Sequence, residues 1–405
     1  MTAFFNLCSV AFLARFSYAL ARNPVLPLFA LALGAGPEAI GLAVGVSTVT
    51  GVFFKLPAGA LSDVIGRRRT MLAGLGFFAL VPFAYLFVES YGQLVLVRFV
   101  HGFATAIYGP VAMAVVAGLA GERKGEMLSW FSSVGIIGTL AGAPVGGFIL
   151  SIMSTAQGPT TLAYRTVFGV VAVTGVAALV LGARLLWQDR PEAATGGFSA
   201  RLQSFRSGIR EVMGDRRVLA TSAMEGVQNL SMGALEAFLP VYAVTVAGFS
   251  PFEAGMLWAV QVVVTMATKP FLGRTSDSRG RLGRRLLIVA GMLCCALPFA
   301  AIPHLTGFLP LMAACLVFGL GEALVTSSSA AMVADLCRAR HYGTAMGVFG
   351  TIFDLGHASG PLLGGILVGA LGYRWSFGLL ALVLVASVPW FLRLVPDDRA
   401  ESPAA

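Results

Sequence analysis

The stretch Gly59-Ala-Leu-Ser-Asp63-Val-Ile-Gly66-Arg67-Arg68-Arg69 returns 214 residues later as Gly273-Arg-Thr-Ser-Asp277-Ser-Arg-Gly280-Arg281. Each copy follows an apolar segment, and in each copy a lysine, Lys55 or Lys269, precedes the aspartate by eight residues. A motif that returns with its flanking residues indicates a chain built from two related halves.

Two further motifs repeat at nearly the same offset. Gly138-xxx-Gly142-Ala-Pro144-xx-Gly147 is followed later by Gly356-xxx-Gly360-Pro361-xx-Gly364-Gly365. Tyr164-Arg165-xx-Phe168-Gly169 is followed by Tyr373-Arg374-xx-Phe377-Gly378. Three matches in phase exclude coincidence, and internal duplication of this kind is typical of membrane transporters.

The composition indicates a membrane protein. Hydrophobic residues make up 57% of the 405 residues, charged residues only 12%, and the mean hydropathy is +0.83. Soluble domains contain about 25% charged residues. Apolar runs of about 20 residues are long enough to cross a bilayer, where only helices satisfy the backbone polar groups of a separate segment. Twelve such runs are predicted, near 4–31, 39–61, 70–88, 93–119, 127–153, 165–187, 218–247, 252–273, 286–304, 308–334, 343–370 and 374–394.

These segments predict an all-α integral membrane protein with twelve transmembrane helices in two pseudo-symmetric six-helix bundles. The expected parts are a first bundle over 1–187, a cytoplasmic linker over 188–217, a second bundle over 218–394 and a cytoplasmic tail over 395–405. The first segment lacks a basic start and a small-residue cleavage site and contains Arg15, so we expect a retained helix and not a signal peptide.

The basic residues indicate topology. Most of the 28 Lys and Arg residues lie in the loops after the even-numbered segments, in the linker and in the tail. This asymmetry follows the positive-inside rule and predicts that both termini are cytoplasmic. The net charge of +9 is therefore no sign of a nucleic-acid partner.

The linker and the cysteines offer less specific signals. Apolar residues at helical spacing between Leu202 and Met213 favour an amphipathic helix on the inner membrane surface, with a simple tether as the alternative. The spacing of the five cysteines suggests neither a metal site nor a disulfide framework: Cys8, Cys294, Cys295, Cys315 and Cys337.

At these motifs the chain resembles the major facilitator superfamily, and within it the twelve-helix drug or metabolite:proton antiporters. The 59–69 stretch matches the family's Gly-x-Leu-x-Asp-x-x-Gly-Arg-Arg loop signature, and Arg98-xx-His101-Gly102 is similar to its Arg-xx-Gln-Gly pattern. The antiporter string Gly-xxx-Gly-Pro-xx-Gly-Gly is intact over 356–365, whereas in the fifth segment Pro144 stands one place late.

The resemblance implies a cytoplasmic gate in which Asp63 faces the start of the eleventh helix. A carboxylate at a helix N-terminus is favoured by roughly 0.3–1 kcal/mol, which suits a latch that opens again. Lys55 and Lys269 either line this closure or extend to the membrane interface. The gate candidates are Gly59, Asp63, Gly66, Arg67, Arg68, Asp277, Arg281, Lys55 and Lys269.

Ionisable residues at membrane depth are costly and mark sites of function. They form stripes at helical spacing on the first, fourth, seventh and tenth segments, the helices that line the central cavity in the resembling fold. The candidates for this cavity are Arg15, Tyr18, Arg22, His101, Tyr108, Asn229, Glu236, Thr326 and His357.

A carboxylate in a low-dielectric interior is a natural proton carrier. By depth, we rank Asp354 and Glu322 first and Glu225 third, with Arg98 as a further coupling residue. The alternative for each carboxylate is a permanent ion pair between helices. His357 and His101 either tune these groups or serve in packing and hydrogen bonding.

The glycine strings predict close helix packing. The resemblance implies that the fifth and eleventh helices meet across the two halves and move during transport, the alternative being tight packing alone. These positions are Gly138, Gly142, Pro144, Gly147, Gly356, Gly360, Pro361 and Gly364.

The sequence favours a secondary active transporter of a small molecule by alternating access, with proton-coupled efflux as the leading expectation. The alternative is uptake or exchange of a small anionic metabolite, since arginines bind carboxylates and phosphates bidentately. A sensor or scaffold would not need so many buried charges. No phosphate loop or nucleophile–base set appears, so an enzyme, a cofactor and a metal are not expected. We expect a monomer in a bacterial inner membrane.

Overall fold

The computed structural model describes residues 2–119, 123–156, 158–185, 214–278, 280–337 and 342–396. The predicted linker lies outside the described residues as far as 213, as does the tail from 397. The side chains of Asp63, Asp277 and Arg281 also lie outside the description, so the predicted gate contacts of these three residues stay predictions.

Among the described residues, the first sequence repeat contains seven helices and a short hairpin. Tyr85–Phe87 is a 3₁₀ turn, η1, and strands β1 (Ser154–Thr155) and β2 (Gly158–Pro159) pair antiparallel. The helices are α1 (Thr2–Leu20), α2 (Val25–Ala32), α3 (Pro37–Ile65), α4 (Arg67–Ala84), α5 (Tyr91–Leu119), α6 (Lys124–Ile152) and α7 (Thr161–Leu185).

Five helices form the second repeat, with a 3₁₀ turn η4 at Ile302–His304. The last helix contains two of the predicted segments, because Gly372 adopts a non-helical conformation (φ 72°, ψ 173°) between them. The helices are α9 (Arg216–Thr245), α10 (Pro251–Ser278), α11 (Gly280–Ala301), α12 (Phe308–Leu336) and α13 (Tyr342–Leu394).

Every predicted segment corresponds to helix in this structure. Among the described residues, nine helical stretches are long and apolar enough to cross a membrane by composition, and α13 counts as one of them. Helices α9 and α10 do not meet that criterion. They carry Glu225, Asn229 and Glu236 on α9 and Gln261 and Lys269 on α10, so their polarity reflects the interior site and not a lack of length.

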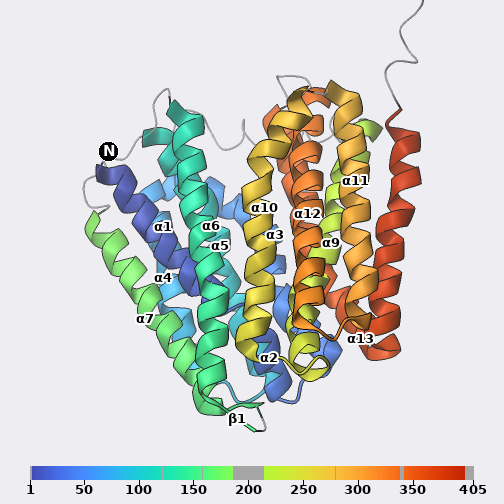
Figure 1. Cartoon of the computed structure of the whole chain (residues 1–405). Coiled ribbons are helices and arrows are strands. Elements are labelled where there is room, and N and C mark those ends of the chain that lie inside the picture. The colour runs from blue at the N-terminus through green and yellow to red at the C-terminus, as the bar shows by residue number, and fades with distance from the viewer. Residues whose placement is uncertain are drawn as a thin grey trace, which may run out of the picture. The chain divides into compact units, whose positions relative to one another are not determined.

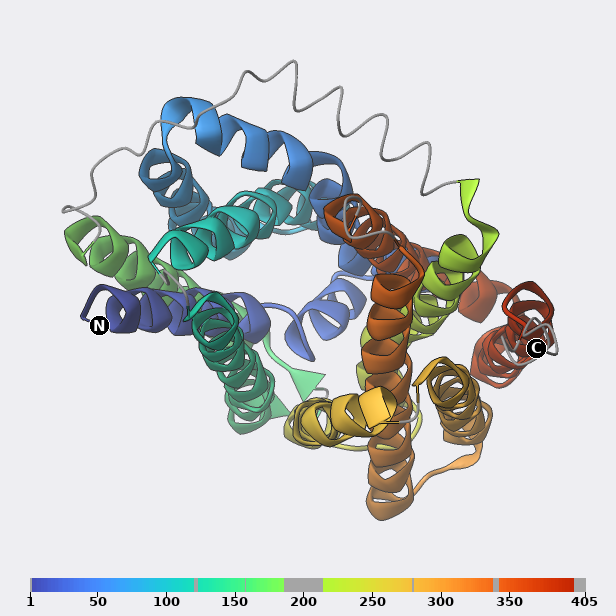
Figure 2. The ribbon, with the colours of Figure 1, turned by 90° about the horizontal axis from the view of Figure 1, so that it is seen from above.

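The described structure divides into two compact units. The first unit contains α1 to α7 together with residues Glu236–Ala259, the hairpin between α9 and α10. The second unit contains the rest of α9 and α10 with α11, α12 and α13. Within each unit the long helices run alongside one another, as Figure 1 shows from the side and Figure 2 from above.

In the first unit, α1 packs on α6 and α7, α3 packs on α5, and α4 packs on α5 and α7. The glycine string of α6 lies against α1, since a Cβ at Gly138 would sit 2.7 Å from the Phe12 carbonyl oxygen, and one at Gly142 would sit 2.7 Å from the Leu20 amide nitrogen. Gly147 lies against the backbone of Pro251. The string therefore brings α6 into contact both with its own repeat and with the α9–α10 hairpin.

In the second unit, α11 packs on α12 and α13. The glycine string of α13 lies against α9, where Gly356 meets the backbone of Gly226 and Gly360 meets the carbonyl of Leu230. Pro361 lies against Gly233. The fifth and first segments of one repeat therefore pack as the eleventh and seventh of the other do, with glycines in the same role.

Candidate functional site

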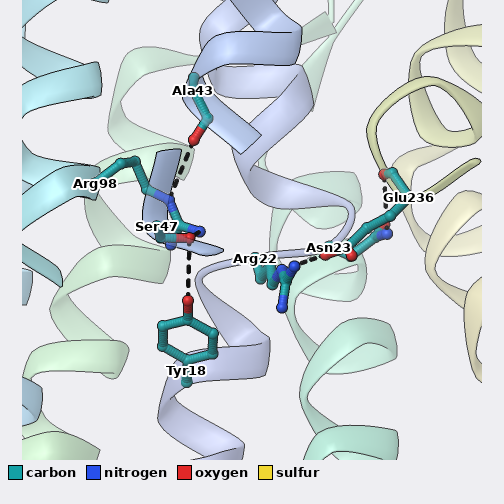
Figure 3. A network of polar contacts seen from close by, with 7 residues as sticks. All are labelled: Tyr18, Arg22, Asn23, Ala43, Ser47, Arg98 and Glu236. Carbon is teal, nitrogen blue, oxygen red and sulfur yellow. Dashed lines mark hydrogen bonds and ion pairs between the residues drawn. The ribbon is translucent and has the colours of Figure 1, made fainter. Parts of the chain in front are cut away.

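The most deeply buried charge of the first unit is Arg98 on α5, whose side chain has no exposed surface. Its Nη2 donates to the Ser47 hydroxyl at 2.6 Å and its Nε donates to the Ala43 carbonyl at 3.4 Å, both on α3 (Figure 3). Among the described residues, its Nη1 has no hydrogen bond of normal geometry, although Tyr85 and Tyr18 lie beside the guanidinium, and no carboxylate lies within ion-pair distance of it. A buried guanidinium without an acid partner is electrostatically expensive.

Aromatic side chains surround Arg98. The Tyr18 hydroxyl donates to Ser47 at 3.2 Å, and the Arg98 Cζ lies 5.5 Å from the centre of the Tyr18 ring. His101, one turn along α5, shares a hydrogen bond of 3.1 Å with the Tyr85 hydroxyl. Its other nitrogen, Nε2, is buried without a partner within the described chain.

An ion pair lies on the other side of Tyr18. Arg22, just after α1, pairs with Glu236 on α9, and the Arg22 Cζ lies 5.8 Å from the Tyr18 ring centre. The Asn23 amide donates to the Glu236 carbonyl at 3.2 Å (Figure 3). Glu236 is 2% exposed and Arg22 is 22% exposed, so water reaches the cation more readily than the anion.

Two further candidates of this unit are Arg15 on α1 and Tyr108 on α5. Arg15 is exposed, and its stem packs against Gly135 of α6. Tyr108 is buried on α5 within electrostatic range of Arg15, and its hydroxyl has no hydrogen-bond partner among the described residues. The structure therefore brings Tyr18, Arg22, Arg98, His101 and Glu236 together and leaves Arg15 nearer solvent.

In the second unit the most buried acid is Glu225 of α9, with no exposed surface. The Asn229 amide donates to its carboxylate oxygen Oε1 at 3.2 Å. The other oxygen, Oε2, has no hydrogen bond of normal geometry within the described residues, and Thr326 lies beside the carboxylate. Glu322 and Lys269 both act on Glu225 electrostatically. Lys269, predicted at the gate, thus lies near an interior acid.

Glu322 of α12 is held by α10. Its Oε2 accepts from the Gln261 amide at 3.2 Å and lies 3.0 Å from the Thr265 hydroxyl. The Gln261 amide also contacts the Met232 sulfur at 2.9 Å. Gln228, one turn from Glu225, is buried beside Cys295 and has no hydrogen bond of normal geometry to its amide group among the described residues. Two carboxylates and several amides thus share one polar layer.

Two further candidates, Asp354 and His357, lie on α13. Both are half-buried, and the His357 ring stacks on Phe353 with centres 6.3 Å apart. The His357 backbone lies against Gly233 of α9. These observations favour a packing contribution from His357.

The loop between α3 and α4 is described in part. Gly66 has φ 97°, a left-handed conformation that favours glycine, and it joins the two helices directly. Arg67 donates to the Ala114 carbonyl at 3.3 Å, while Arg68 and Lys55 are half-buried. Among the described residues, a Cβ at Gly59 would meet nothing within 4 Å.

Sequence reasoning missed several members of both polar sets. Ser47, Asn23 and Tyr85 in the first unit, and Gln261 and Thr265 in the second, are uncharged residues in apolar segments. A signal was present, since each is a polar or hydroxyl-bearing side chain placed at membrane depth. Among the described residues, no group of three or more His, Cys, Asp or Glu side chains is placed to hold a metal ion.

Long apolar helices surround buried charged side chains and polar atoms that lack hydrogen bonds of normal geometry. This arrangement is that of a polytopic membrane protein with a polar interior. Comparison with known proteins gives its family. The profile described as Major Facilitator Superfamily matches residues 7–361 and 281–405. The chain belongs to this family and is a membrane transporter with twelve helices in two halves, which confirms the predicted fold and resemblance.

Similar proteins differ in what their names say they carry. The uncharacterized MFS-type transporter MJ1560 of Methanocaldococcus jannaschii is 23% identical over 93% of this chain and 92% of its own length. The 3-(3-hydroxy-phenyl)propionate transporter of Escherichia coli is 28% identical over 85% and 82%. The multidrug transporter MdfA of Yersinia pestis is 28% identical over 51% of this chain and 48% of that protein.

Among solved structures, a bacterial homologue of the human lysosomal transporter Spinster superposes with a TM-score of 0.78. It is 14% identical, with 97% of this chain and 95% of that chain covered. This likeness concerns the fold alone.

Proposed function

We propose that the protein is a proton-coupled exporter of a small, amphiphilic compound. The observation that carries this proposal is Glu225, a fully buried carboxylate with one incompletely bonded oxygen, within electrostatic range of a second carboxylate, Glu322. Two acids in one low-dielectric layer resist double ionisation, so one of them readily takes up and releases a proton. The similarity to a multidrug transporter over half the chain supports export.

The proposal includes Asp354 as a third carboxylate, and Lys269 as a cation that favours the ionised state of Glu225. It places the chain as a monomer in a bacterial inner membrane with both termini cytoplasmic. The opposing possibility is that these acids are permanent ion-pair partners, in which case replacing them leaves coupling intact.

Inside-out vesicles test coupling and direction together. A pH gradient is established, a panel of drugs and metabolites is added, and proton release is followed with a pH-sensitive dye. We expect compound-induced release with the native protein and at least tenfold less with Glu225→Gln or Glu322→Gln. Asp354→Asn is measured alongside. Glu89→Gln, which removes an exposed acid, serves as the control.

Full activity in all three acid-to-amide variants would mean that the protein does not couple transport to protons through these carboxylates. Release that appears only in right-side-out vesicles would reverse the proposed direction or orientation.

A second function, uptake or exchange of a small organic anion, is favoured by one observation. Arg98 is buried, its Nη1 has no hydrogen bond of normal geometry, and it has no acid partner among the described residues. A relative similar over most of the chain carries a name that specifies a phenylpropionate, which is a carboxylate. Counterflow of a labelled carboxylate in the absence of a pH gradient would favour this function over export.

A further inference from the structure

The polar set of the first unit has more positive charge than negative. Two guanidinium groups, Arg22 and Arg98, lie beside the Tyr18 ring, and among the described contacts one carboxylate, Glu236, pairs with Arg22. Tyrosine and the buried imidazole of His101 add no negative charge to compensate. A surplus buried cation is costly, and its cost falls when an anion binds nearby.

The two arginines differ in access. Arg98 has no exposed surface and is fixed by Ser47 and Ala43, so it acts as a stationary positive charge. Arg22 lies in the short connection between α1 and α2 and is 22% exposed. A ligand can therefore reach Arg22 directly, while Arg98 contributes through the electrostatic field.

Unsatisfied donors also point to a ligand. Arg98 Nη1 and His101 Nε2 are fully buried and have no hydrogen bond of normal geometry within the described chain, with Tyr85 and Tyr18 beside the Arg98 guanidinium. Buried polar atoms in native structures nearly always have partners, so such atoms mark places where a partner from outside the chain binds. Both of these residues lie against Tyr18, since the His101 ring centre is 5.2 Å from that of Tyr18.

We propose that this set binds the carboxylate group of the transported compound, and that Glu236 occupies the place of that carboxylate on Arg22 when no ligand is bound. Arginine forms bidentate pairs with carboxylates, so one carboxylate exchanges for another on the same guanidinium with little change in geometry. Arg98 favours the exchange by supplying charge that Glu236 alone does not neutralise.

Exchange has a structural consequence. Glu236 belongs to the α9–α10 hairpin, which is also tied to the first unit by Asn23 at the Glu236 carbonyl and by Ser151 at the Phe252 amide. When the ligand takes Arg22, the hairpin loses the Arg22–Glu236 ion pair, while the Asn23 and Ser151 hydrogen bonds stay in place. Carboxylate binding therefore loosens the hairpin from its contacts with α1 and α6.

The test uses the full-length protein in detergent at constant pH and ionic strength. Melting temperature is measured against sodium salts of monocarboxylates from acetate to 3-phenylpropionate, with the matching alcohols and amides as neutral controls. A ligand that binds only the folded state raises the melting temperature by an amount that grows with the logarithm of its concentration divided by its dissociation constant. We expect at least one carboxylate to stabilise the native protein while its neutral analogue does not.

Three variants separate an exchangeable counter-ion from a structural ion pair. Glu236→Gln removes the internal competitor, so we expect a lower melting temperature without ligand, a larger rescue by carboxylate and at least threefold tighter apparent binding. Arg22→Gln abolishes binding, and Arg98→Gln weakens it at least tenfold. Arg184→Gln, an exposed arginine at the end of α7, is the matched control and leaves binding unchanged.

Unchanged or weaker binding in Glu236→Gln would overturn the proposal, as would retained binding in Arg22→Gln. No stabilisation by any carboxylate, in either the native protein or Glu236→Gln, would do the same. If Arg98→Gln does not fold, the Glu236→Gln result decides. The inference rests on the transport function proposed above, whose substrate it narrows to carboxylates. If the native protein binds carboxylates in detergent but shows no proton coupling in vesicles, the proposed export mechanism is contradicted and the carboxylate site is not.

Discussion

Two helix crossings, one in each unit, share a backbone contact and differ in charge. Gly102 of α5 lies against α3, where its Cβ would sit 2.7 Å from the Ser47 carbonyl oxygen. Gly319 of α12 lies against α10, where its Cβ would sit 2.7 Å from the Gln261 carbonyl oxygen. The two halves therefore reuse one scaffold at this point.

The side chains around these crossings are opposite in sign. At the first crossing Ser47 binds Arg98, and at the second Gln261 binds Glu322. Duplication thus preserved the glycine that allows the backbones to approach, while the neighbouring positions diverged into a cationic interior and an anionic one. The same backbone packing is found in both units, and the units differ in the charge of the side chains beside it.

The largest expected effect comes from breaking the shared scaffold. Valine at Gly102 or Gly319 would force backbones apart, so we expect each to lose about 3 kcal/mol of unfolding free energy, at the upper end of overpacking costs. Unfolding in mixed micelles measures this loss. Gly169→Val and Gly378→Val are repeat-matched controls, because a Cβ at either glycine would meet nothing within 4 Å.

Equal losses at the two crossings with neutral controls would support one duplicated framework. A loss of unfolding free energy in Gly102→Val with none in Gly319→Val would show that the helices at the second crossing shift to make room for the side chain. The two crossings would then be alike in sequence and not in packing.

A smaller effect separates the charges. Ser47→Ala removes the acceptor of a buried guanidinium, and we expect a loss of about 2 kcal/mol that does not vary between pH 5 and 8, because arginine stays protonated. Thr265→Ala removes a donor near Glu322. Its hydroxyl has one proton and lies 3.0 Å from three acceptors, the carboxylate and the carbonyls of Gln261 and Gly319.

An ionised carboxylate is the strongest of these acceptors. The loss in Thr265→Ala is therefore expected to be smaller in a Glu322→Gln background than in the native protein. A double-mutant cycle, followed by unfolding in mixed micelles, checks this. A loss of the same size in both backgrounds would mean that the hydroxyl serves the backbone and not the acid. Denaturation of Ser47→Ala across the pH range checks the first expectation.

The sequence predicts the framework far better than the polar partners. The repeated Asp-containing loop and glycine strings indicate duplication, and the length of each apolar run predicts its helix. Charged residues such as Arg98, Glu225 and Glu322 stand out because hydrocarbon disfavours them. Ser47 and Thr265 do not stand out, since hydroxyl groups occur in apolar helices bonded to their own backbone.

One signal for the missed partners was available. The offset of 214 residues that aligns Lys55 with Lys269 also aligns Ser47 with Gln261. Which acid pairs with which cation cannot be obtained this way, because pairing depends on helix rotation. Depth alone ranked Asp354 above Glu225, although Glu225 is the more deeply buried of the two.

The smallest expected effect tests an asymmetry between the repeats. Ser151 of α6 accepts the Phe252 amide of the hairpin at 2.9 Å, while Gly369, its counterpart by the offset of the glycine strings, has no side chain to do so. Ser151→Ala is expected to lose about 0.5 kcal/mol, the lower end for a neutral hydrogen bond, because Phe252 is partly exposed and water replaces the acceptor. Ser154→Ala, whose hydroxyl bonds within its own turn to Leu150, is the control. Equal losses in the two variants would mean that Arg22, Asn23 and glycine packing hold the hairpin without Ser151. A larger loss in Ser151→Ala would mean that this hydrogen bond still holds the hairpin after a ligand has replaced Glu236 on Arg22.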